Sequence, residues 1–335
     1  MKIRVAINGF GRIGRLVFRK MIEDNDFDVV AINDLTDAEQ LAYLLKYDTS
    51  HRNYKNHEIT SEDENIIFDN KKIKVFKEQD PKDLPWKELN VDVVFECTGF
   101  FTDKEKAYAH INAGAKKVII SAPAKGDLKT IVYNVNHEIL NGDEQIISAA
   151  SCTTNCLAPV MKLLCDNYGV EKGFMTTVHA YTNDQSTLDV AHKKGHLSRR
   201  GRAAAANIVP SSTGAASAIG LVIPELKGKL DGTAMRVPVT TGSVIDLVLE
   251  LKKSVTKEEI NDLFMNNQND TLRYTTDPVV SSDIIGEECG ALVDGLLTNI
   301  VEVNGKQLVK VVAWYDNEMG YSCQMVKTAK YFANK

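Results

Sequence analysis

Cys152 stands between two small hydroxyl residues, Ser151 and Thr153, in the segment ASCTTNCLAP. From there apolar side chains recur at helical spacing as far as residue 168, so this cysteine is placed at the start of a predicted helix. The N–H groups at a helix N-terminus lower the pKa of a thiol, and a neighbouring imidazolium lowers it further. The position favours a nucleophilic thiolate over the alternative, a small packed side chain. We interpret Cys156, one turn further along, as such a packed residue.

The candidate base for this thiol is His179. It lies in MTTVHAYT, where apolar and polar residues alternate as they do in a half-buried strand. The other histidines fall in segments that we predict to be polar loops or exposed faces. Cys152 and Cys156 lack the further ligands of a structural zinc site, and a disulfide between neighbouring turns of a helix has poor geometry. The sequence therefore predicts a thiol–imidazole pair and no metal site.

Further hydroxyl residues and two arginines offer contacts to a small tetrahedral anion. Ser151 and Thr153 flank the thiol, and PSSTG (residues 210–214) adds hydroxyls beside a glycine backbone. Arg200 lies in a basic loop, and Arg236 lies among apolar residues in MRVPV. Arginine binds phosphate through two parallel N–H groups, which lysine cannot do. The set predicts a phosphate-binding substrate site, with surface solvation as the alternative for the other arginines of the loop.

A second kind of chemistry is predicted near the amino terminus, where residues 9–14 read GFGRIG and fit G-x-G-x-x-G. They follow a predicted strand and open a predicted helix. In that context Gly9 permits the tight turn, Gly11 lets a pyrophosphate approach the backbone, and Gly14 permits close helix packing. Asp34 ends the next predicted strand, where its carboxylate can accept hydrogen bonds from ribose hydroxyls and would repel a 2′-phosphate. We predict a dinucleotide site that favours NAD over NADP.

Two kinds of sheet are expected to position these groups. In the first 150 residues short apolar runs alternate with helical patterns, which predicts an α/β domain with a Rossmann-type parallel sheet. Its expected strands are residues 3–7, 29–32, 91–95, 117–121 and 146–149, with helices from residue 13 and over residues 104–113. Longer alternating segments follow Cys152 and predict a second, α+β domain on a mostly antiparallel sheet. Its expected strands are residues 175–182, 237–239, 244–251, 290–294 and 308–315.

The boundary between the two domains is placed at the cysteine. We expect residues 1–151 to form an NAD-binding domain and residues 152–316 to form a catalytic domain. A final helix, predicted over residues 318–332, places residues 317–335 back on the first domain. The loop at residues 192–206, HKKGHLSRRGRAAAA, is basic and long for a connection, which indicates a functional or interface role.

The composition excludes several classes of protein. A chain of 335 residues with 44% hydrophobic and 25% charged residues is typical of globular proteins and long enough for two cores. No apolar run approaches the ~20 residues of a membrane span. A net charge of −5 argues against the clustered positive charge that nucleic-acid binding requires. The amino terminus, MKIRVAINGF, does not resemble a signal peptide, so we expect a cytoplasmic protein whose six cysteines are free thiols.

Over essentially its whole length the sequence resembles the phosphorylating glyceraldehyde-3-phosphate dehydrogenases. The matching motifs are INGFGRIGR, NDLTD, ECTG, KKVIISAP, ASCTTNCLAP, TTVHAYTNDQ, RAAAANIVPSSTGAA, PELKGKL, MRVPV and WYDNE. The block around Cys152 is highly specific to that family. The resemblance implies a glycolytic homotetramer with one NAD per subunit that converts glyceraldehyde 3-phosphate and inorganic phosphate to 1,3-bisphosphoglycerate.

Carried over motif by motif, the resemblance assigns roles to individual residues. It makes Cys152 the nucleophile that forms a thioester and His179 its base. The implied cofactor contacts are Arg12, Ile13, Asp34, Ser121 and Asn317, the last of which holds the nicotinamide carboxamide. The substrate's own phosphate is assigned to Thr182 and Arg236. The attacking phosphate is assigned to Ser151, Thr153, Arg200, Thr213 and Gly214, with Arg200 able to serve either anion.

Departures from the family pattern concern the cofactor and not the thiol. Gln79 stands where the family often has an arginine near the adenine, and Val190 and Ala191 replace a Leu-Pro pair of NAD-selective members. These changes weaken the exclusion of NADP, although the carboxylate of Asp34 still opposes NADP binding. Two alternative functions stay open: an erythrose-4-phosphate dehydrogenase of the same fold, in which water takes the thioester, and a non-catalytic dinucleotide-binding protein. The second alternative predicts a lost nucleophile or base, and neither is lost here.

Overall fold

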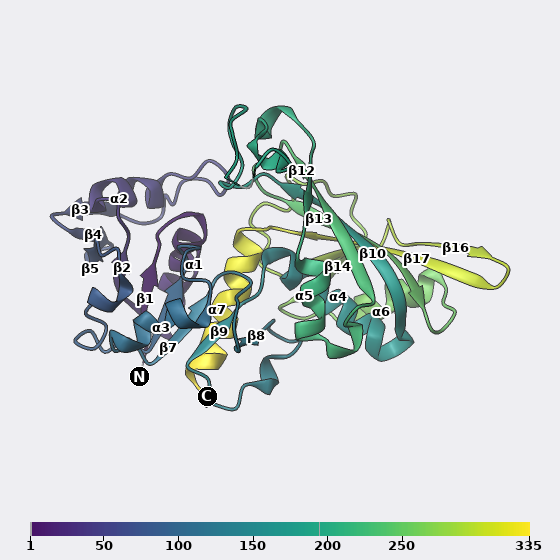
Figure 1. The fold of residues 1–335 in the computed structure, drawn as a ribbon, viewed down its shortest axis with the longest axis horizontal. Coiled ribbons are helices and arrows are strands. Elements are labelled where there is room, and N and C mark those ends of the chain that lie inside the picture. The colour runs from purple at the N-terminus through teal and green to yellow at the C-terminus, as the bar shows by residue number, and fades with distance from the viewer. Residues whose placement is uncertain (1, 194) are drawn as a thin grey trace. The chain divides into compact units, whose positions relative to one another are not determined.

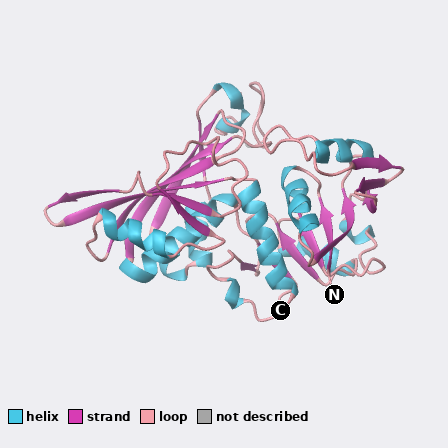
Figure 2. Ribbon diagram, turned by 180° about the vertical axis from the view of Figure 1, so that it is seen from behind, coloured by secondary structure: helices cyan, strands magenta, loops and turns pink. Residues whose placement is uncertain are grey.

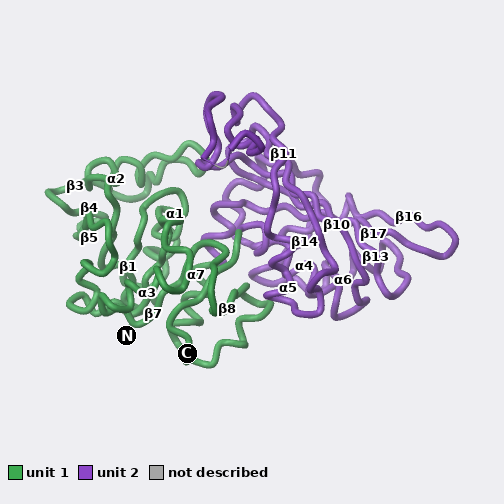
Figure 3. The backbone as a smooth tube through the Cα atoms, in the orientation of Figure 1, with its two compact units in different colours: residues 1–151, 325–335 green, residues 152–324 purple. Residues whose placement is uncertain are grey.

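The structure is a computed structural model that describes residues 2–193 and 195–335. The chain forms two compact units (Figure 3): residues 1–151 together with 325–335, and residues 152–324. Within the described residues, each unit contains its own β-sheet, with nine strands in unit 1 and eight in unit 2. Lys194, which belongs to the predicted basic loop, lies outside the described residues.

Unit 1 contains the predicted Rossmann-type sheet (Figure 1). Its strand order is β3-β4-β5-β2-β1-β6-β7-β9-β8, and each pair from β5 to β8 is parallel. The strands are β1 (Ile3–Asn8), β2 (Phe27–Asn33), β3 (Ile59–Glu62), β4 (Asn65–Phe68), β5 (Lys71–Phe76), β6 (Val93–Glu96), β7 (Lys117–Ile120), β8 (Lys129–Thr130) and β9 (Ile146–Ser148). The helices are α1 (Arg12–Glu23), α2 (Ala38–Lys46) and α3 (Lys104–Asn112), with short 3-10 turns at Pro81–Asp83 and His137–Ile139.

The central strands of unit 1 are buried on both faces. Every residue of β6 is buried, and so is nearly every residue of β1. Crossover helices cover the two faces of a parallel sheet, which is why these strands read as continuous apolar runs. On one side Val94 of β6, Ala107 of α3 and the indole of Trp86 belong to the same buried cluster.

The carboxyl ends of these strands bring the polar residues of unit 1 to one edge of the sheet. Asn8 ends β1, Asn33 ends β2, and Glu96 ends β6. Asp34 and Ser121 follow β2 and β7 directly. In open α/β sheets this edge is where ligands bind, because the loops that leave the strands form a crevice there.

The meander β3-β4-β5 was not predicted. Its two hairpins are antiparallel, and β5 then joins β2 in parallel. The second hairpin turns at Asp69 and Asn70, which both have positive φ. Asp and Asn tolerate that conformation in two-residue hairpin turns, so these residues were the available signal. The strands are short and carry several charges, which hid their alternation.

Unit 2 contains the predicted mostly antiparallel sheet. Its strand order is β11-β12-β10-β13-β17-β15-β14, with β16 paired to β17; the exceptions to antiparallel pairing are β10–β12 and β14–β15. The strands are β10 (Val170–Ala180), β11 (Val209–Ser212), β12 (Leu230–Val237), β13 (Ser243–Leu251), β14 (Leu272–Thr275), β15 (Ala291–Asp294), β16 (Asn299–Val303) and β17 (Lys306–Tyr315). The helices are α4 (Cys152–Tyr168), α5 (Ala215–Val222) and α6 (Lys257–Asn266), with 3-10 turns at Arg199–Gly201, Ala204–Ala206 and Pro224–Leu226. A further helix, α7 (Met319–Ala333), begins in unit 2 and continues into unit 1.

Helices cover one face of the unit 2 sheet (Figure 2). Helix α4 packs on β10, β13, β15 and β17, α5 packs on β12, and α6 packs on β14. Along β13 the side chains of Ile245, Leu247 and Leu249 are fully buried on the helix side. Val248 points to the other face, where it is paired with the exposed Phe174 of β10. The sheet therefore leaves apolar side chains exposed on the face without helices.

Two boundaries differ from those expected. In place of the strand expected at residues 237–239, the structure has β12 at Leu230–Val237, which ends there because Pro238 has no N–H group to continue the ladder. Helix α7 forms near its predicted position. Its first turns belong to unit 2, however, and the C-terminal segment of unit 1 begins at residue 325 rather than at 317. Gln324 explains this, because its amide binds the carbonyls of Asp270 and Glu288 in unit 2.

Within the described part of the chain, no helix combines the length and the apolar character needed to cross a membrane. The same residues contain no cluster of three or more His, Cys, Asp or Glu side chains that could hold a metal ion. The six cysteines all lie among the described residues, and none of them forms a disulfide there.

Candidate active site

The glycine turn in unit 1 has the geometry that its sequence pattern predicts. Gly9 has a φ of 90°, and a Cβ there would lie 2.7 Å from the backbone nitrogen of Thr98. A Cβ on Gly14 would lie 2.1 Å from the carbonyl oxygen of Gly9. A Cβ on Gly11, the residue that precedes α1, would meet nothing within 4 Å. Gly9 and Gly14 are thus required by packing, whereas Gly11 leaves open space beside the N–H groups of α1, as pyrophosphate binding requires.

A cavity of about 560 Å³ opens beside this turn, within unit 1. Its lining residues are Asn8, Gly9, Gly11, Asn33, Asp34, Leu35, Glu78, Gln79, Cys97, Thr98, Phe100 and Phe101. The carboxylate of Asp34 accepts hydrogen bonds from the backbone N–H groups of Phe10 (2.7 Å) and Thr36 (3.0 Å). A carboxylate has about four acceptor sites, so capacity remains for ribose hydroxyls. The cavity, the open glycine and the carboxylate fit a bound dinucleotide.

The other predicted cofactor residues lie in α1, directly after β7, and shortly before α7. Arg12 and Ile13 are in the first turn of α1, and Arg12 donates two hydrogen bonds to Asp48. Although burial raises the pKa of Asp48, hydrogen bonds from His51 and Arg12 hold that pKa far below its ordinary value. Ser121 follows β7 in unit 1.

Asn317 lies in unit 2, directly before α7. Its side-chain oxygen accepts a hydrogen bond of 2.8 Å from Ser243, and the hydroxyl of Thr241 lies 3.3 Å from the same oxygen. Ser243 in turn accepts the backbone N–H of Ala180, at the end of the strand that carries His179. These contacts fix the Asn317 side chain within unit 2.

In unit 2 the structure brings Cys152 and His179 together, as predicted. Cys152 is the first residue of α4, His179 lies at the end of β10, and their Sγ and Nε2 atoms are 3.4 Å apart. The imidazole packs edge-to-face on the ring of Tyr315, and the hydroxyl of that tyrosine contacts the hydroxyls of Thr153 (2.9 Å) and Thr177 (2.8 Å). The pair is therefore seated on a buried, hydrogen-bonded support.

The hydrogen bonds of His179 define where its proton lies. Nδ1 is 2.7 Å from the carbonyl oxygen of Ala180, which can only accept, so Nδ1 carries the proton. Nε2 then presents a lone pair to the sulfur of Cys152. Burial, together with the charge of Arg236, lowers the pKa of His179 to about 3. The imidazole is thus neutral at physiological pH and oriented as a base.

The pKa of Cys152 differs from the expectation. Burial raises it above the ordinary value of a thiol, against the charge of Arg236 and hydrogen bonds from Thr153 that lower it. The expected lowering rested on the N-terminus of α4 and, in addition, on an imidazolium next to the sulfur. The neutral state of His179 removes the imidazolium, and burial of the thiol outweighs the remaining contacts that lower its pKa. In the free protein the pair therefore consists of a thiol and a neutral imidazole.

Arg236 and Thr182, the residues predicted to bind the substrate's phosphate, form one cluster in unit 2. Nη1 of Arg236 donates to the hydroxyl of Thr182 at 2.9 Å and to the carbonyl of Ala180 at 3.2 Å. Among the described residues the buried Nε of Arg236 has no hydrogen-bond partner. Asp184 binds both the hydroxyl of Thr182 and the guanidinium of Arg200. The cluster combines two arginines with a buried donor that is not satisfied by the protein, which suits an anion.

The residues assigned to the attacking phosphate lie on several elements. Thr153 is in α4, and Thr213 and Gly214 directly precede α5. Ser151 is the last residue of the first segment of unit 1. Gly214 has open space where a side chain would be, and the hydroxyl of Thr213 accepts the N–H of Ala215.

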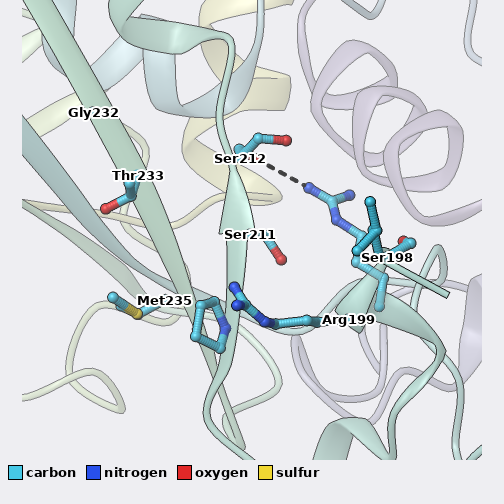
Figure 4. Close-up of a pocket in the computed structure, with 10 residues that line it drawn as sticks. Ser198, Arg199, Ser211, Ser212, Gly232, Thr233 and Met235 are labelled. Carbon is cyan, nitrogen blue, oxygen red and sulfur yellow. Dashed lines mark hydrogen bonds between the residues drawn. The ribbon is translucent and has the colours of Figure 1, made fainter. Parts of the chain in front are cut away.

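Arg200 borders a separate cavity of about 440 Å³ in unit 2 (Figure 4). Its Nη2 donates to the Ser212 carbonyl at 3.5 Å, which the dashed line marks. Arg199 also lines this cavity, and its side chain extends toward the strand that carries Ser211 and Ser212 (Figure 4). Arg200 thus lies between Asp184 and the hydroxyl-rich strand β11, a position compatible with either anion.

Sequence reasoning missed three features of the site. Asp184 and Tyr315 lie inside quoted motifs, TTVHAYTNDQ and WYDNE, but nothing local indicates which partners they meet. The third is the burial of His110, which the sequence analysis placed with the exposed histidines. Its side chain is fully buried in α3, where it contacts Glu96 and Trp86. The prediction was wrong because the polar neighbours of His110 in sequence face solvent while His110 itself faces the sheet.

These observations first define a class of protein. The structure combines a Rossmann-type unit that has an open glycine turn with a cysteine–histidine pair and an arginine cluster. This combination is typical of an NAD-dependent dehydrogenase that acts on a phosphorylated substrate.

Comparison with known proteins then specifies the family. Residues 3–104 match the glyceraldehyde 3-phosphate dehydrogenase NAD binding domain, and residues 151–317 match the C-terminal domain of the same enzyme. The chain is 61% identical to the glyceraldehyde-3-phosphate dehydrogenase of Clostridium pasteurianum and 60% identical to that of Clostridium acetobutylicum, each over 98% of both chains. It is 55% identical to that of Streptococcus pyogenes over 99% of both chains. The chain belongs to the glyceraldehyde-3-phosphate dehydrogenase family.

Family membership confirms the predicted fold, activity and cofactor. The chain is an oxidoreductase of glycolysis that uses NAD and acts on glyceraldehyde 3-phosphate and inorganic phosphate. The two alternative functions are not favoured by these relatives.

Proposed function

We propose that the oxidation proceeds through a thioester on Cys152, with His179 as proton acceptor and inorganic phosphate as the second nucleophile. The observation that supports this most directly is the 3.4 Å separation of Sγ and Nε2, with the lone pair of Nε2 facing the sulfur. A nucleophile within reach of a correctly oriented base is the arrangement that covalent catalysis needs.

The proposed sequence begins when Nε2 of His179 takes the proton of the Cys152 thiol. The sulfur attacks the aldehyde carbon, and the proton passes to the resulting alkoxide, which gives a hemithioacetal. His179 then removes the hydroxyl proton while hydride leaves the same carbon, so that a thioester remains. NAD, when bound, supplies the acceptor for this hydride. A phosphate oxygen attacks the thioester carbonyl, the C–S bond breaks, and the acyl phosphate leaves as the sulfur regains its proton.

The cluster around Arg236 is proposed to hold the substrate's phosphate next to this pair. The charge of Arg236 is one reason why the pKa of His179 is low. A phosphate dianion bound to Arg236 offsets that charge, so His179 accepts a proton more readily once substrate is present. Thr182 and the unsatisfied Nε of Arg236 supply the hydrogen bonds. The attacking phosphate is proposed to use Ser151, Thr153, Arg200, Thr213 and Gly214.

We also propose which residues hold NAD. The glycine turn and the N-terminus of α1, with Arg12 and Ile13, bind the pyrophosphate, Asp34 binds the adenosine ribose, and Ser121 and Asn317 complete the contacts. In domain terms, residues 1–151 with the C-terminal helix are assigned to cofactor binding, and residues 152–316 to catalysis. The open space at Gly11 and the free acceptor capacity of Asp34 support the first of these assignments.

A homotetramer in the cytoplasm is proposed on two grounds. Glycolytic chemistry belongs to that compartment. The face of the unit 2 sheet without helices exposes Phe174, Val248, Val301, Val303 and Leu308. An apolar patch of this kind indicates a protein interface, because monomeric proteins seldom leave such a group in water. Sedimentation equilibrium of the chain, with Phe174→Asp to weaken the patch, would distinguish a tetramer from smaller species.

The decisive test is the phosphate dependence of NADH formation from glyceraldehyde 3-phosphate, run with NAD and NADP in parallel. The proposal expects turnover only with phosphate or arsenate present, because the thioester must be captured before the sulfur is free again. Phosphate-independent turnover, or preference for erythrose 4-phosphate, would instead support thioester hydrolysis by water. Cys152→Ser is the matched control, and we expect it to bind NAD and to lose nearly all oxidation.

A further inference from the structure

Glu96 is a buried carboxylate that accepts four hydrogen bonds but lines no part of the described cavity. Its side chain is fully buried at the end of β6. Oε2 accepts from Nδ2 of Asn8 at 2.6 Å and from Nε2 of His110 at 3.0 Å. Oε1 accepts from the backbone N–H of Thr98 at 2.8 Å and from the hydroxyl of the same residue. Both oxygens are therefore fully used by protein donors.

Trp86 fixes the proton of His110. The indole N–H can only donate, and it lies 3.0 Å from Nδ1 of His110, so Nδ1 must be the acceptor nitrogen. The proton of the neutral imidazole is then on Nε2, from which it is donated to Glu96. This order of donors runs in one direction from Trp86 through His110 to Glu96. A network of this kind holds its members in a single arrangement, because reversing one bond leaves two donors facing each other.

On its other side the network reaches the walls of the cavity. Asn8 connects Glu96 to Asn33, because its Nδ2 donates to Glu96 and its side-chain oxygen accepts from Nδ2 of Asn33 at 2.7 Å. Asn33 makes two hydrogen bonds to the backbone of Glu78. Its Oδ1 accepts from the N–H of Glu78 at 2.9 Å, and its Nδ2 donates to the carbonyl of Glu78 at 2.9 Å. Asn8, Asn33, Glu78 and Thr98 all line the cavity, whereas Glu96, His110 and Trp86 do not. Cavity-lining residues from β1, β2 and the segment after β6 are thus joined through one carboxylate that does not itself line the cavity.

The position of these walls tolerates little change. The backbone nitrogen of Thr98 lies so close to Gly9 that a Cβ there would approach it to 2.7 Å. The N–H of Cys97 donates to the carbonyl of Asn8 at 2.7 Å. A displacement of the turn at residues 96–98 therefore moves the glycine turn as well.

We propose that Glu96, held by His110, is a positioning residue for NAD that sets the shape of the cavity for the adenosine half of the cofactor. The proposal rests on the proposed assignment of Asp34 and this cavity to the adenosine ribose. It predicts that damage to Glu96 weakens binding of the adenosine part selectively and leaves the thiol chemistry in unit 2 intact. A purely structural role would lower stability and leave the affinity of the folded protein unchanged.

Glu96→Gln is the first test, because it keeps the shape and replaces one acceptor oxygen by a donor. When the side-chain oxygen of the glutamine accepts from Thr98, its amide nitrogen faces the N–H donors of Asn8 and His110. His110 cannot shift its proton to Nδ1 to relieve this, because Nδ1 accepts the indole N–H of Trp86. Isothermal titration calorimetry of the full chain with ADP-ribose should give a Kd raised at least tenfold. The KM for NAD should rise in parallel, while kcat at saturating NAD and the KM for glyceraldehyde 3-phosphate stay within twofold. Hydrogen exchange at the amides of residues 97–100 should accelerate.

A pair of substitutions at His110 separates hydrogen bonding from packing. In His110→Gln the side-chain oxygen can accept from Trp86 and the amide can donate to Glu96, whereas His110→Leu removes both functions. We expect His110→Gln to keep ADP-ribose affinity within threefold of the unsubstituted chain and His110→Leu to lose at least tenfold. This comparison decides the proposal even where Glu96→Gln does not fold.

Asn136→Ala is the matched control for loss of a buried polar side chain. Asn136 is buried in unit 1 and binds the backbone of Thr130 and Val132, and it does not line the cavity. We expect it to lower the unfolding midpoint without changing the Kd for ADP-ribose. Equal ADP-ribose affinity in folded Glu96→Gln, or equal affinity of the two His110 variants, would overturn the proposal. Failure of the unsubstituted chain to bind ADP-ribose would instead overturn the assignment of the cavity.

Discussion

The Sγ atom of Cys152 lies 3.4 Å from Nε2 of His179, and the opposite nitrogen of that imidazole donates to the carbonyl of Ala180. Burial raises the pKa of the thiol and lowers that of the imidazole, so both groups are neutral before reaction. The site therefore contains a neutral imidazole next to a thiol, and not a preformed thiolate–imidazolium ion pair. In the proposed mechanism, negative charge develops on the sulfur only when His179 takes its proton, and the charge of Arg236, which lowers the pKa of Cys152, favours that step.

Replacing the base tests this arrangement directly. In His179→Asn no group at position 179 can take the thiol proton, so we expect the rate of Cys152 alkylation by iodoacetamide at pH 7.5 to fall at least tenfold. The difference should narrow at pH 10, because hydroxide then ionises the thiol without help from a base. Binding of ADP-ribose serves as the control for a folded chain. An unchanged alkylation rate at pH 7.5 would show that His179 does not activate the sulfur.

The same histidine should make the fold sensitive to acid. Its pKa is about 3 in the folded protein and about 6.5 when unfolded, so below pH 6.5 the unfolded chain binds a proton that the folded chain does not. The contribution of neutral His179 to stability is complete above pH 6.5 and is lost progressively as the pH falls toward 3. Between pH 7.5 and 5 this amounts to about 2 kcal/mol of unfolding free energy.

Urea unfolding of the unsubstituted chain and of His179→Asn at both pH values measures this contribution. The stability difference between the two proteins should move by about 2 kcal/mol in favour of the variant at pH 5. A difference that does not change with pH would contradict a depressed pKa at His179.

How far the sequence predicted this site depends on the range of the interactions involved. The glycine turn and the start of α4 are defined by neighbouring residues, so local patterns were sufficient to place Gly9, Gly14 and Cys152. His179 was found because strand alternation singled it out. Each of these predictions uses spacing along the chain and needs no knowledge of distant partners.

Features that depend on distant partners could not be predicted in the same way. The pKa of Cys152 was expected to be lowered, but its direction follows from burial and from the neutral state of His179, which become known only in three dimensions. The buried bond between Trp86 and His110 joins a turn to a helix 24 positions away. Polar residues that meet across such separations leave no periodic signal, so the predicted exposure of His110 was wrong.

Arg236→Lys tests the anion cluster. An ammonium group cannot reproduce the guanidinium that binds Thr182 and Ala180 and still presents a further N–H, so we expect the KM for glyceraldehyde 3-phosphate to rise about tenfold or more. The Kd for ADP-ribose should stay constant, since its proposed site is in unit 1. Arg202→Lys is the matched control, because Arg202 is exposed and paired with Asp189. A similar KM for both lysine variants would remove Arg236 from the substrate site.

Alanine substitutions of the two glycines at the start of α1, Gly11 and Gly14, should have different effects on stability and on cofactor binding. In Gly14→Ala the new methyl group would lie 2.1 Å from the carbonyl oxygen of Gly9, so the turn and the helix must move apart. We expect a large loss of stability, of the order of the 1–3 kcal/mol that overpacking costs, seen as a lower urea midpoint. In Gly11→Ala the methyl group meets no protein atom within 4 Å, and we expect a normal urea midpoint.

Gly11→Ala should nevertheless weaken cofactor binding, because the methyl group occupies the space through which a pyrophosphate approaches the backbone. Calorimetric titration with NAD should show a Kd raised at least tenfold, while adenosine, which has no phosphate, should bind both proteins equally. This contrast ties the effect to the pyrophosphate and not to a general change of the cavity. If Gly11→Ala bound NAD as tightly as the unsubstituted chain, the open space beside α1 would not be the pyrophosphate site, and the assignment of the glycine turn would have to be abandoned.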